Sequence, residues 1–239
     1  MALYDISDLR RLPLGGKSLA FDGTQGQVTL GTSDPFIGSF YVSGLVKWRG
    51  TNGNFHTILA KRDSYAANGL KFSLSINTSG ILTMDTVTSF VNWGYTFPYA
   101  KWVHMLWSHN TTGFTDDLYI NGLLSSSQGI ATLGTKTDAL ISIGSCQATP
   151  QDFFFGNLDE FVIGSGAPTA AQALAIYAKY AYTGTVWGQY KFDEGSGTSA
   201  LNSQGVGPTG TISGATYSTD VVMGGRSIVN RSLVSRSVI

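Results

Sequence analysis

Short runs in which apolar and polar residues alternate recur along the chain, and most are followed by a cluster of Gly, Asn, Asp or Ser. In one run, Phe72, Leu74 and Ile76 point to one side of an extended strand. Ser73 and Ser75 point to the other side, which predicts a half-buried antiparallel strand. The runs are residues 27–30, 40–48, 70–76, 102–108, 118–120, 140–143 and 158–163. Many short strands joined by tight turns predict a sandwich or a barrel.

The composition agrees with an all-β protein. Glycine accounts for 30 of the 239 residues, and only two of the 15 acidic residues are Glu. Because Glu favours helices whereas Gly and Asp favour turns, the chain is predicted to turn often and to contain little helix. The dipeptide Asn121-Gly122 lies between apolar residues and is the strongest short signal for a β-hairpin.

One segment, residues 169–181, departs from the β pattern. It is rich in Ala and follows Pro168. Thr169 and Gln172 have the spacing of a capping box, in which each side chain satisfies a free backbone N–H group. We expect one short surface helix that closes a sheet edge or links two halves of the molecule. Its apolar residues at helical spacing are Leu174, Tyr177 and Ala181.

Charge and cysteine content exclude several classes of protein. The chain has 15 basic and 15 acidic residues, so its net charge of zero argues against nucleic acid as a partner. No run of about 18 apolar residues occurs, so neither a transmembrane helix nor a membrane partner is expected. Residues 1–20 lack a basic start followed by an apolar block, so no secretory signal is expected. The single cysteine, Cys146, excludes an internal disulfide and a cysteine-based zinc site.

The two ends of the chain differ from the middle. Residues 1–16 contain a short amphipathic stretch, and the C-terminal end reads RSIVN-RSLVS-RSVI, a five-residue repeat. Neither end has the polar, charged composition of a solvated disordered tail. We therefore expect residues 1–16 and 224–239 to be arms that dock to neighbouring subunits. In the C-terminal arm, Arg226, Arg231 and Arg236 are candidates to pair with carboxylates on a neighbour.

Six stretches of the chain, in order, resemble the laminin-G-like branch of the concanavalin A-like lectin/glucanase superfamily. They are KSLAFDGTQGQVTLG (17–31), FYVSGLVKW (40–48), KWVHMLWS (101–108), DLYINGLL (117–124), LISIG (140–144) and FFFGNLDEFVIGSGAPTAAQ (153–172). Their order and spacing match the family from Lys17 to about Ala181. The resemblance implies a two-sheet antiparallel jelly-roll sandwich, a fold often used to bind glycans or proteins. The predicted fold is therefore all-β, with one short helix and extended N- and C-terminal arms.

Residues 190–218 resemble a strand that precedes the FDG strand in many such domains, but here they lie near the C-terminal end. Residues 223–229 (MGGRSIV) then echo residues 14–20 (LGGKSLA). We expect the displaced strand to close onto the N-terminal strand, because about 55 residues after Gly184 are too few for an independent core. The expected domain then spans residues 17–223. The alternative is a swapped strand that completes a neighbouring subunit.

Some relatives in the superfamily hydrolyse glycosidic bonds, and the glucanases among them place two Glu and one Asp close together on one strand. Retaining hydrolysis requires two carboxyl groups about 5–5.5 Å apart. This chain offers Asp159 and Glu160 without a second Glu nearby, and adjacent strand residues point to opposite faces. We expect no enzymatic activity and a structural role for Asp159 at a strand start. His104 is expected to pack or to form a cross-strand hydrogen bond, and Trp102 to lie in the core.

Calcium, as a structural ion, is the one cofactor considered. Laminin-G-like and lectin relatives often hold one near a sheet edge, and calcium prefers oxygen ligands from Asp, Asn and backbone carbonyl groups. Asp22, Asp193 and Asn202 lie in turns that resemble those of the family and are the candidate ligands. No dense Asp/Asn loop occurs in the sequence.

Glycan binding requires an exposed aromatic ring beside polar groups, since sugar rings stack on apolar surfaces and sugar hydroxyl groups need hydrogen-bond partners. Residues 90–99 (FVNWGYTFPY) are expected to form a loop of this kind. The candidate contact residues are Asn92, Trp93, Tyr95 and Tyr99. The alternative is a loop folded over the sandwich edge or buried against a partner.

Three functions remain open. The first is a non-enzymatic virion structural protein, a capsid decoration or phage tail protein, whose arms dock to other virion proteins or to copies of itself. Such a protein can also attach to a surface glycan. The second is a free carbohydrate-binding, lectin-like module, extracellular or at the cell surface. The third is a glycoside hydrolase, which the carboxylate inventory disfavours. The arms favour the first function and a place on the virion, by analogy with laminin-G-like modules of phage proteins.

Overall fold

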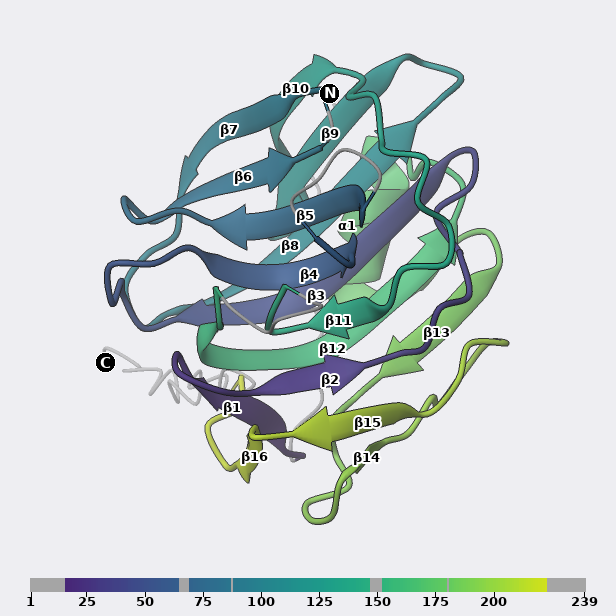
Figure 1. The fold of residues 1–239 in the computed structure, drawn as a ribbon. Helices are drawn as coiled ribbons and strands as arrows, with labels where there is room; N and C mark the ends of the chain where they lie inside the picture. The colour runs from purple at the N-terminus through teal and green to yellow at the C-terminus, as the bar shows by residue number, and fades with distance from the viewer. Residues whose placement is uncertain (1–15, 65–68, 87, 147–151, 180, 223–239) are drawn as a thin grey trace, which may run out of the picture.

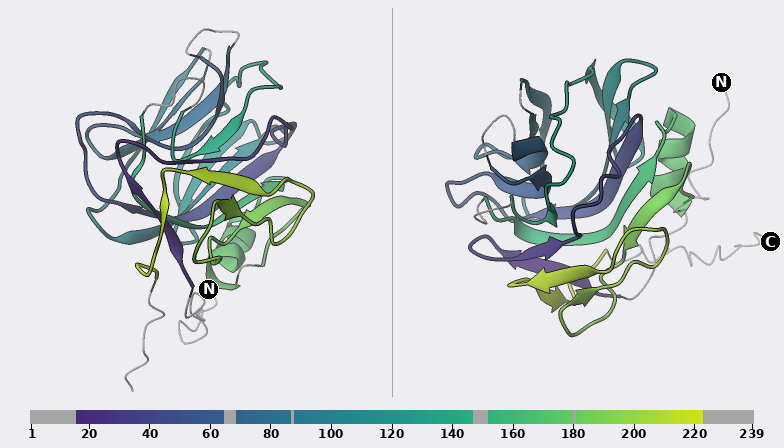
Figure 2. Two further views of the ribbon diagram at one scale, coloured as in Figure 1. Left: turned by 60° about the horizontal axis from the view of Figure 1, so that its bottom comes forward. Right: turned by 45° about the vertical axis from the view of Figure 1, so that its right-hand side comes forward.

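The computed structural model describes residues 16–64, 69–86, 88–146, 152–179 and 181–222. Within this part of the chain, the strands form two sheets that pack face to face (Figures 1 and 2). Neighbouring strands are antiparallel in both sheets, and one short helix accompanies them. The prediction of an all-β, two-sheet antiparallel sandwich with one helix is confirmed.

The first sheet, called sheet A, has the strand order β10-β9-β8-β3-β12-β1-β16, and β13 also pairs with β12. Its strands are β10 (Leu123–Gly129), β9 (Thr115–Ile120), β8 (Trp102–Asn110), β3 (Phe40–Trp48), β12 (Phe155–Ser165), β1 (Ser18–Asp22), β16 (Thr216–Ser218) and β13 (Val186–Tyr190). The second, called sheet B, has the order β14-β15-β2-β11-β4-β5-β6-β7. Its strands are β14 (Ser199–Ala200), β15 (Gly210–Ser213), β2 (Gln27–Thr29), β11 (Ile141–Ile143), β4 (His56–Arg62), β5 (Leu70–Ile76), β6 (Ile81–Asp85) and β7 (Phe90–Thr96).

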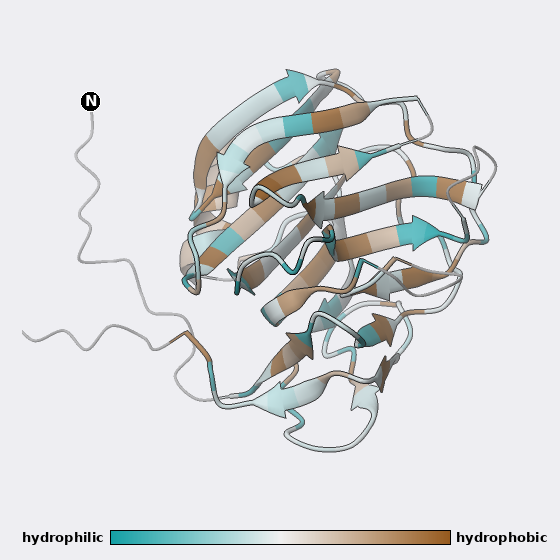
Figure 3. Ribbon diagram, turned by 60° about the vertical axis from the view of Figure 1, so that its left-hand side comes forward, coloured by the Kyte–Doolittle hydropathy of each residue, from teal (hydrophilic) through white to brown (hydrophobic). Residues whose placement is uncertain are grey.

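The core lies between the two sheets, and strand alternation fills it. Phe72, Leu74 and Ile76 on β5 are fully buried, as predicted, but Ser73 and Ser75 are also buried, so β5 is not the half-buried strand that the sequence predicts. Rings from the two sheets meet there, since the ring centroids of Phe72 on β5 and Trp107 on β8 lie 5.1 Å apart. Figure 3 shows the apolar positions as brown bands that recur along the strands. Because these side chains point inward, those between them point to the outer face of sheet B.

The β9–β10 hairpin turns at Asn121 and Gly122, as the sequence predicts. Their φ angles are +50° and +79°. Positive φ at both central residues is typical of a type I′ turn, whose twist suits the flanking strands. The pairing of β10 with β9 accordingly starts directly after the turn, where Leu123 lies opposite Ile120.

The helix α1 (Ala170–Lys179) begins with the predicted capping box. The backbone N–H of Thr169 donates to Oε1 of Gln172 at 2.8 Å, and the backbone N–H of Gln172 donates to Oγ1 of Thr169 at 3.3 Å. Ala173 and Ile176 are its buried residues. They belong to a cluster with Tyr41, Leu106, Tyr119, Val162 and Val186. The helix therefore covers the outer face of sheet A, which corrects the expectation that it closes a sheet edge.

No helix in the described part of the chain is long and apolar enough to span a membrane.

The late segment of the chain pairs with the first strands of the same chain. β15 pairs with β2, and β16 pairs with β1, where Ser18 lies opposite Ser218. In this structure the displaced segment completes its own sandwich. The expected arms, residues 1–16 and 224–239, lie outside the described residues apart from Gly16. The same holds for the candidate assembly residues Arg226, Arg231 and Arg236.

Asp220, just after β16, connects this segment to the outer face of sheet A through hydrogen bonds and ion pairs. Its carboxylate accepts hydrogen bonds from Nζ of Lys47 at 2.7 Å and from Nε1 of Trp102 at 3.3 Å. A nitrogen of the Arg49 guanidinium lies 3.3 Å from the same carboxylate. Trp102 is half-buried at this outer face. The expectation that Trp102 lies in the core is therefore wrong, because β8 directs Val103 inward and Trp102 outward.

We expect Asp220→Ala to lower the free energy of unfolding by about 1–3 kcal/mol, because Lys47 then stays partly buried without its carboxylate partner. Urea unfolding measures the change. Asp138→Ala is the matched control, since that side chain is 78% exposed. The control should leave the free energy of unfolding close to that of the wild type. Equal losses in the two variants would contradict a fastening role for Asp220.

Candidate functional site

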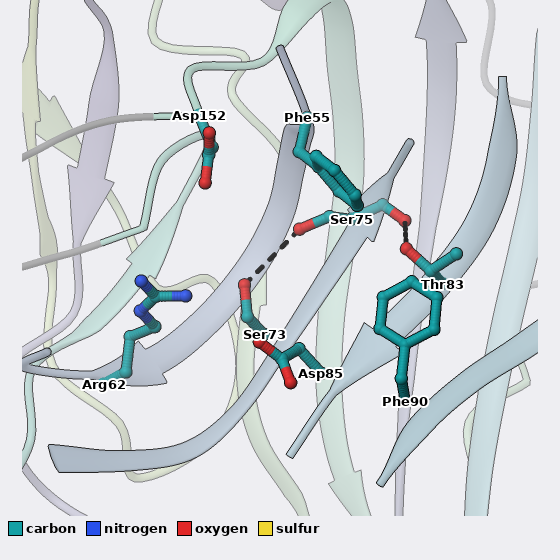
Figure 4. Close-up of a pocket in the computed structure, with 8 residues that line it drawn as sticks. All are labelled: Phe55, Arg62, Ser73, Ser75, Thr83, Asp85, Phe90 and Asp152. Atoms are coloured by element: carbon teal, nitrogen blue, oxygen red, sulfur yellow. Dashed lines mark hydrogen bonds between the residues drawn. The ribbon is translucent and has the colours of Figure 1, made fainter. Parts of the chain in front are cut away.

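The outer face of sheet B carries a hollow of about 240 Å³ that crosses strands β4 to β7 (Figure 4). It is lined by Phe55, Arg62, Ser73, Ser75, Thr83, Asp85, Phe90 and Asp152. The strand register places the floor, since Ser73 lies opposite Asp85 and Ser75 lies opposite Thr83. These four residues share one face because the residues between them point into the core.

Linked hydroxyl groups form the floor of the hollow. Oγ of Ser75 lies 3.2 Å from Oγ1 of Thr57 and 3.4 Å from Oγ of Ser73. Oγ1 of Thr83 donates a hydrogen bond to the backbone carbonyl of Ser75 at 3.1 Å. A hydroxyl group has one donor and two acceptor positions, so these bonds leave acceptor positions for a ligand.

Two phenylalanine rings stand at the rim of the hollow. Phe55 precedes β4 and is 37% exposed, and Phe90 begins β7 and is 57% exposed. In Figure 4 the two rings lie on one side of the hollow, next to Ser75 and Thr83. Apolar rings beside a few fixed polar groups are typical of a site for a small ligand.

Three charged side chains complete the lining. Arg62 ends β4, Asp85 ends β6, and Asp152 precedes β12. In Figure 4 Arg62 and Asp152 lie on the side away from the two rings. Burial raises the pKa of Asp85, and the positive charge of Arg62 opposes this shift. The hollow thus combines apolar surface, hydroxyl groups and charge in a small volume.

The lining is suited to binding by stacking and hydrogen bonds. Ser73 and Ser75 are hydrogen-bonded to other hydroxyl groups rather than to a histidine. A serine nucleophile is activated by a hydrogen bond to a base. The described residues that line the hollow do not form such a contact.

Trp93, expected at the centre of a glycan-binding loop, is a core residue. The segment expected as a loop forms strand β7, and Trp93 is 4% exposed. Its ring centroid lies 6.3 Å from that of Trp107 on sheet A. The prediction that Trp93 contacts a sugar is wrong, because a buried ring offers no face to a ligand.

The other three residues of the expected patch lie apart from one another. Tyr95 is half-buried and packs on Phe97, with ring centroids 5.2 Å apart. Tyr99 is 70% exposed, but it lies beyond the far end of β7 from the hollow. Asn92 is exposed and lies opposite Thr83. Asn92 is thus paired with a residue that lines the hollow, but none of the four residues of the predicted patch lines it.

The three candidate calcium ligands lie in separate turns. Asp22 ends β1, and its Oδ1 accepts two backbone N–H groups of the following turn, both at 2.8 Å. Oδ1 of Asp193 accepts the backbone N–H of Lys17 at 2.9 Å, at the opposite end of β1. Oδ1 of Asn202 accepts the backbone N–H of Gln189 at 3.0 Å. The described ranges contain no group of three or more His, Cys, Asp or Glu side chains that could hold a metal ion.

Sequence reasoning missed the aromatic and charged residues of the hollow. The outward direction of Ser73 and Ser75 was the available signal. Phe55 and Phe90 come from segments on either side of these serines in the sequence, and strand pairing alone brings them together. The missed residues are Phe55, Arg62, Thr83, Asp85, Phe90 and Asp152.

Asp159 and Glu160 lie within β12 on sheet A, not at a strand start as expected. β12 bulges at this point, and Glu160 has a φ angle of +47°. Each of the two residues is 7% exposed. Burial, together with the adjacent Glu160, raises the pKa of Asp159 to about 8, and burial raises the pKa of Glu160 to about 7. These acids belong to the other sheet and do not contribute to the hollow.

His104 is buried beneath α1 and forms the expected cross-strand contact. Its Nε2 lies 2.9 Å from Oγ of Ser43, and its ring centroid lies 5.4 Å from that of Tyr177. Burial lowers the pKa of His104 to about 4 and also lowers the pKa of His56. Both side chains are therefore neutral at pH 7.

A family model described as the concanavalin A-like lectin/glucanases superfamily matches residues 22–173, from the end of β1 into α1. The match covers more than half of the chain. The chain belongs to the concanavalin A-like lectin/glucanase superfamily. The resemblance seen in the sequence is thereby confirmed at the level of this superfamily. Among curated proteins, none matches the chain.

Three solved structures illustrate the shared superfamily fold. A putative carbohydrate binding protein from Bacteroides ovatus has a TM-score of 0.66 at 17% identity, over 87% of this chain and 61% of that one. A heptameric SAP-like pentraxin from Limulus polyphemus has a TM-score of 0.57 at 16% identity, over 84% and 97%. The ligand binding domain of botulinum neurotoxin serotype D, in complex with N-acetylneuraminic acid, has a TM-score of 0.52 at 19% identity, over 69% and 43%. At these identities the likeness shows the fold alone.

We expect the free energy of unfolding to fall as the pH rises from 7 to 8. Between pH 7 and 8 the native state still holds part of the protons of Asp159 and Glu160, with pKa values near 8 and 7, whereas the unfolded chain has released them. Stability is therefore lost as the pH rises towards the folded pKa, with a slope on the order of 1 kcal/mol per pH unit. His56 and His104, whose pKa values are lowered, affect stability only below about pH 6.5.

Urea unfolding at closely spaced pH values tests this dependence. Asp159→Asn should flatten the slope between pH 7 and 8, because one of the two titrating groups is gone. Asp138→Asn removes an exposed carboxyl group and should keep the wild-type slope. A wild-type stability that stays constant over this range contradicts the assignment.

Proposed function

We propose that this superfamily member is a non-catalytic carbohydrate-binding module and that the hollow on sheet B is its binding site. The observation that carries the proposal is the pairing of two half-exposed rings, Phe55 and Phe90, with a floor of buried hydroxyl groups. A sugar has apolar ring faces and a rim of hydroxyl groups, so it needs both kinds of surface at once.

Hydrogen bonds within the protein hold the side chains of the floor in place. Ser73, Ser75 and Thr83 are at most 6% exposed and are tied to one another or to the backbone. Little conformational entropy is then lost on binding, because these side chains do not need to be immobilised. The solved structures with this fold support the proposal, since one is named a putative carbohydrate binding protein and another is complexed with N-acetylneuraminic acid.

We expect Phe90→Ala to weaken saccharide binding about tenfold, because a stacking ring contributes on the order of 1.5 kcal/mol. A glycan array identifies a saccharide for the wild type, and calorimetry then compares the variants. Phe114→Ala is the matched control, because Phe114 is 71% exposed in the β8–β9 turn, outside the hollow. Its affinity should equal that of the wild type.

The variant Tyr99→Ala distinguishes saccharide binding in the hollow from binding at the patch that the sequence predicts. It should bind as the wild type does, and the saccharide should be recovered uncleaved after incubation with the full chain. Loss of binding in Tyr99→Ala with none in Phe90→Ala would contradict the proposed site. Cleavage of the saccharide would contradict a non-catalytic role.

A role on a virion is a second proposal. It is favoured by the side of the sandwich from which both expected arms start. β1 and β16 pair, and Asp220 lies against the outer face of sheet A. Both expected arms thus start from neighbouring strands, whereas the hollow opens on the outer face of sheet B. Arms that dock to other virion proteins or to copies of this chain would then display the hollow outward.

We expect the full chain to form defined oligomers and a chain of residues 17–223 to be a folded monomer, because the arms are the proposed docking segments. Light scattering gives the two masses, and thermal unfolding shows that the shorter chain is folded. Monomers of both chains with similar melting would exclude self-assembly through the arms.

A further inference from the structure

The hollow is lined by more negatively charged than positively charged groups, and the negatively charged groups are the more exposed. Two of its charged groups are carboxyl groups, Asp85 and Asp152, and one is the guanidinium of Arg62. Arg62 is only 2% exposed, whereas both acids are partly exposed. A ligand that enters the hollow therefore meets negative charge more readily than positive charge.

The two lysines of β4 and β5 do not offset this charge. Nζ of Lys61 donates to the backbone carbonyls of Thr32 and Ala139 at 3.0 and 2.8 Å. Nζ of Lys71 lies 2.6 Å from the carboxylate of Asp34, and both of these side chains are 8% exposed. Neither lysine lines the hollow.

Three short segments that follow strands of this sheet, and that lie outside the described residues, contain no charged residue. Residues 65–68 read YAAN, residue 87 is Val, and residues 147–151 read QATPQ. None of them is Lys, Arg, Asp or Glu. These segments therefore cannot add a charge to the one guanidinium and two carboxyl groups that line the hollow.

We infer that the hollow selects saccharides that carry no carboxylate and discriminates against uronic and other acidic sugars, an inference that rests on the proposed function. A neutral sugar donates its hydroxyl protons to Asp85 and Asp152, and such charge-assisted hydrogen bonds are strong. A sugar carboxylate brings a like charge next to the same two acids. The repulsion is weakly screened in a partly buried site.

Matched pairs of saccharides test the inference on the full chain. Galactose- and galacturonate-containing oligosaccharides of one linkage, and glucose and glucuronate counterparts, differ only by the carboxylate. Calorimetry at pH 7.5 should show the acidic member of each pair binding at least about tenfold more weakly. Raising the salt concentration should narrow the difference, because it screens like charges.

Asp85→Asn should reduce the ratio of neutral to acidic affinity, because one of the two repelling charges is removed. Asp152→Asn removes the other repelling charge and should also reduce the ratio, and it keeps the test available if Asp85→Asn fails to fold. Asp138→Asn removes the same charge from an exposed site outside the hollow and should keep the wild-type ratio.

Equal or tighter binding of the acidic members by the wild type overturns the inference and leaves the proposed function standing. An unchanged ratio in both hollow variants also overturns it. Failure of the wild type to bind any saccharide overturns the proposed function, and the inference with it.

Discussion

The alternation of side chains along β5 and β6 is the constraint on which both the core and the candidate site depend. Phe72, Leu74 and Ile76 fill the space between the sheets, and each one fixes the direction of its neighbours. Ser73 and Ser75 are thereby held on the outer face with little freedom of their own. A densely packed interior thus gives the floor of the hollow its rigidity, which a loop of the same composition would lack.

The two outer faces of the sandwich differ in what lies on them. Sheet A is covered by α1, through Ala173 and Ile176, and by the segment that ends at Asp220. α1 also lies over the buried side chain of His104, which contacts Tyr177 of the helix. Sheet B carries the hollow on its outer face, with Phe90 more than half exposed at its rim. The protein's own chain thus covers part of one outer face, whereas the other outer face carries the hollow that we propose as the binding site.

The sequence predicts those features of the fold that depend on a few neighbouring residues. The Asn121-Gly122 turn, the capping box of Thr169 and the alternation around Phe72 each depend on a few neighbouring residues, and the structure has all three. Trp93 was misplaced because β7 continues where a loop was expected, and pairing with β6 then turns its ring inward. The hollow was not predictable in the same way. Its rim and charges come from the ends of several strands, and only sheet register brings them together.

The pairing of β1 with β16 places the two ends of the described chain side by side. Adjacent antiparallel strands lie about 5 Å apart, so a few residues suffice to join one end to the other. The sandwich has the geometry of a domain that can be inserted whole into a surface loop of a carrier protein. It can also be closed into a ring and reopened at a distant turn. In either form every strand keeps its neighbours, and the order of strands along the chain becomes independent of their order in space.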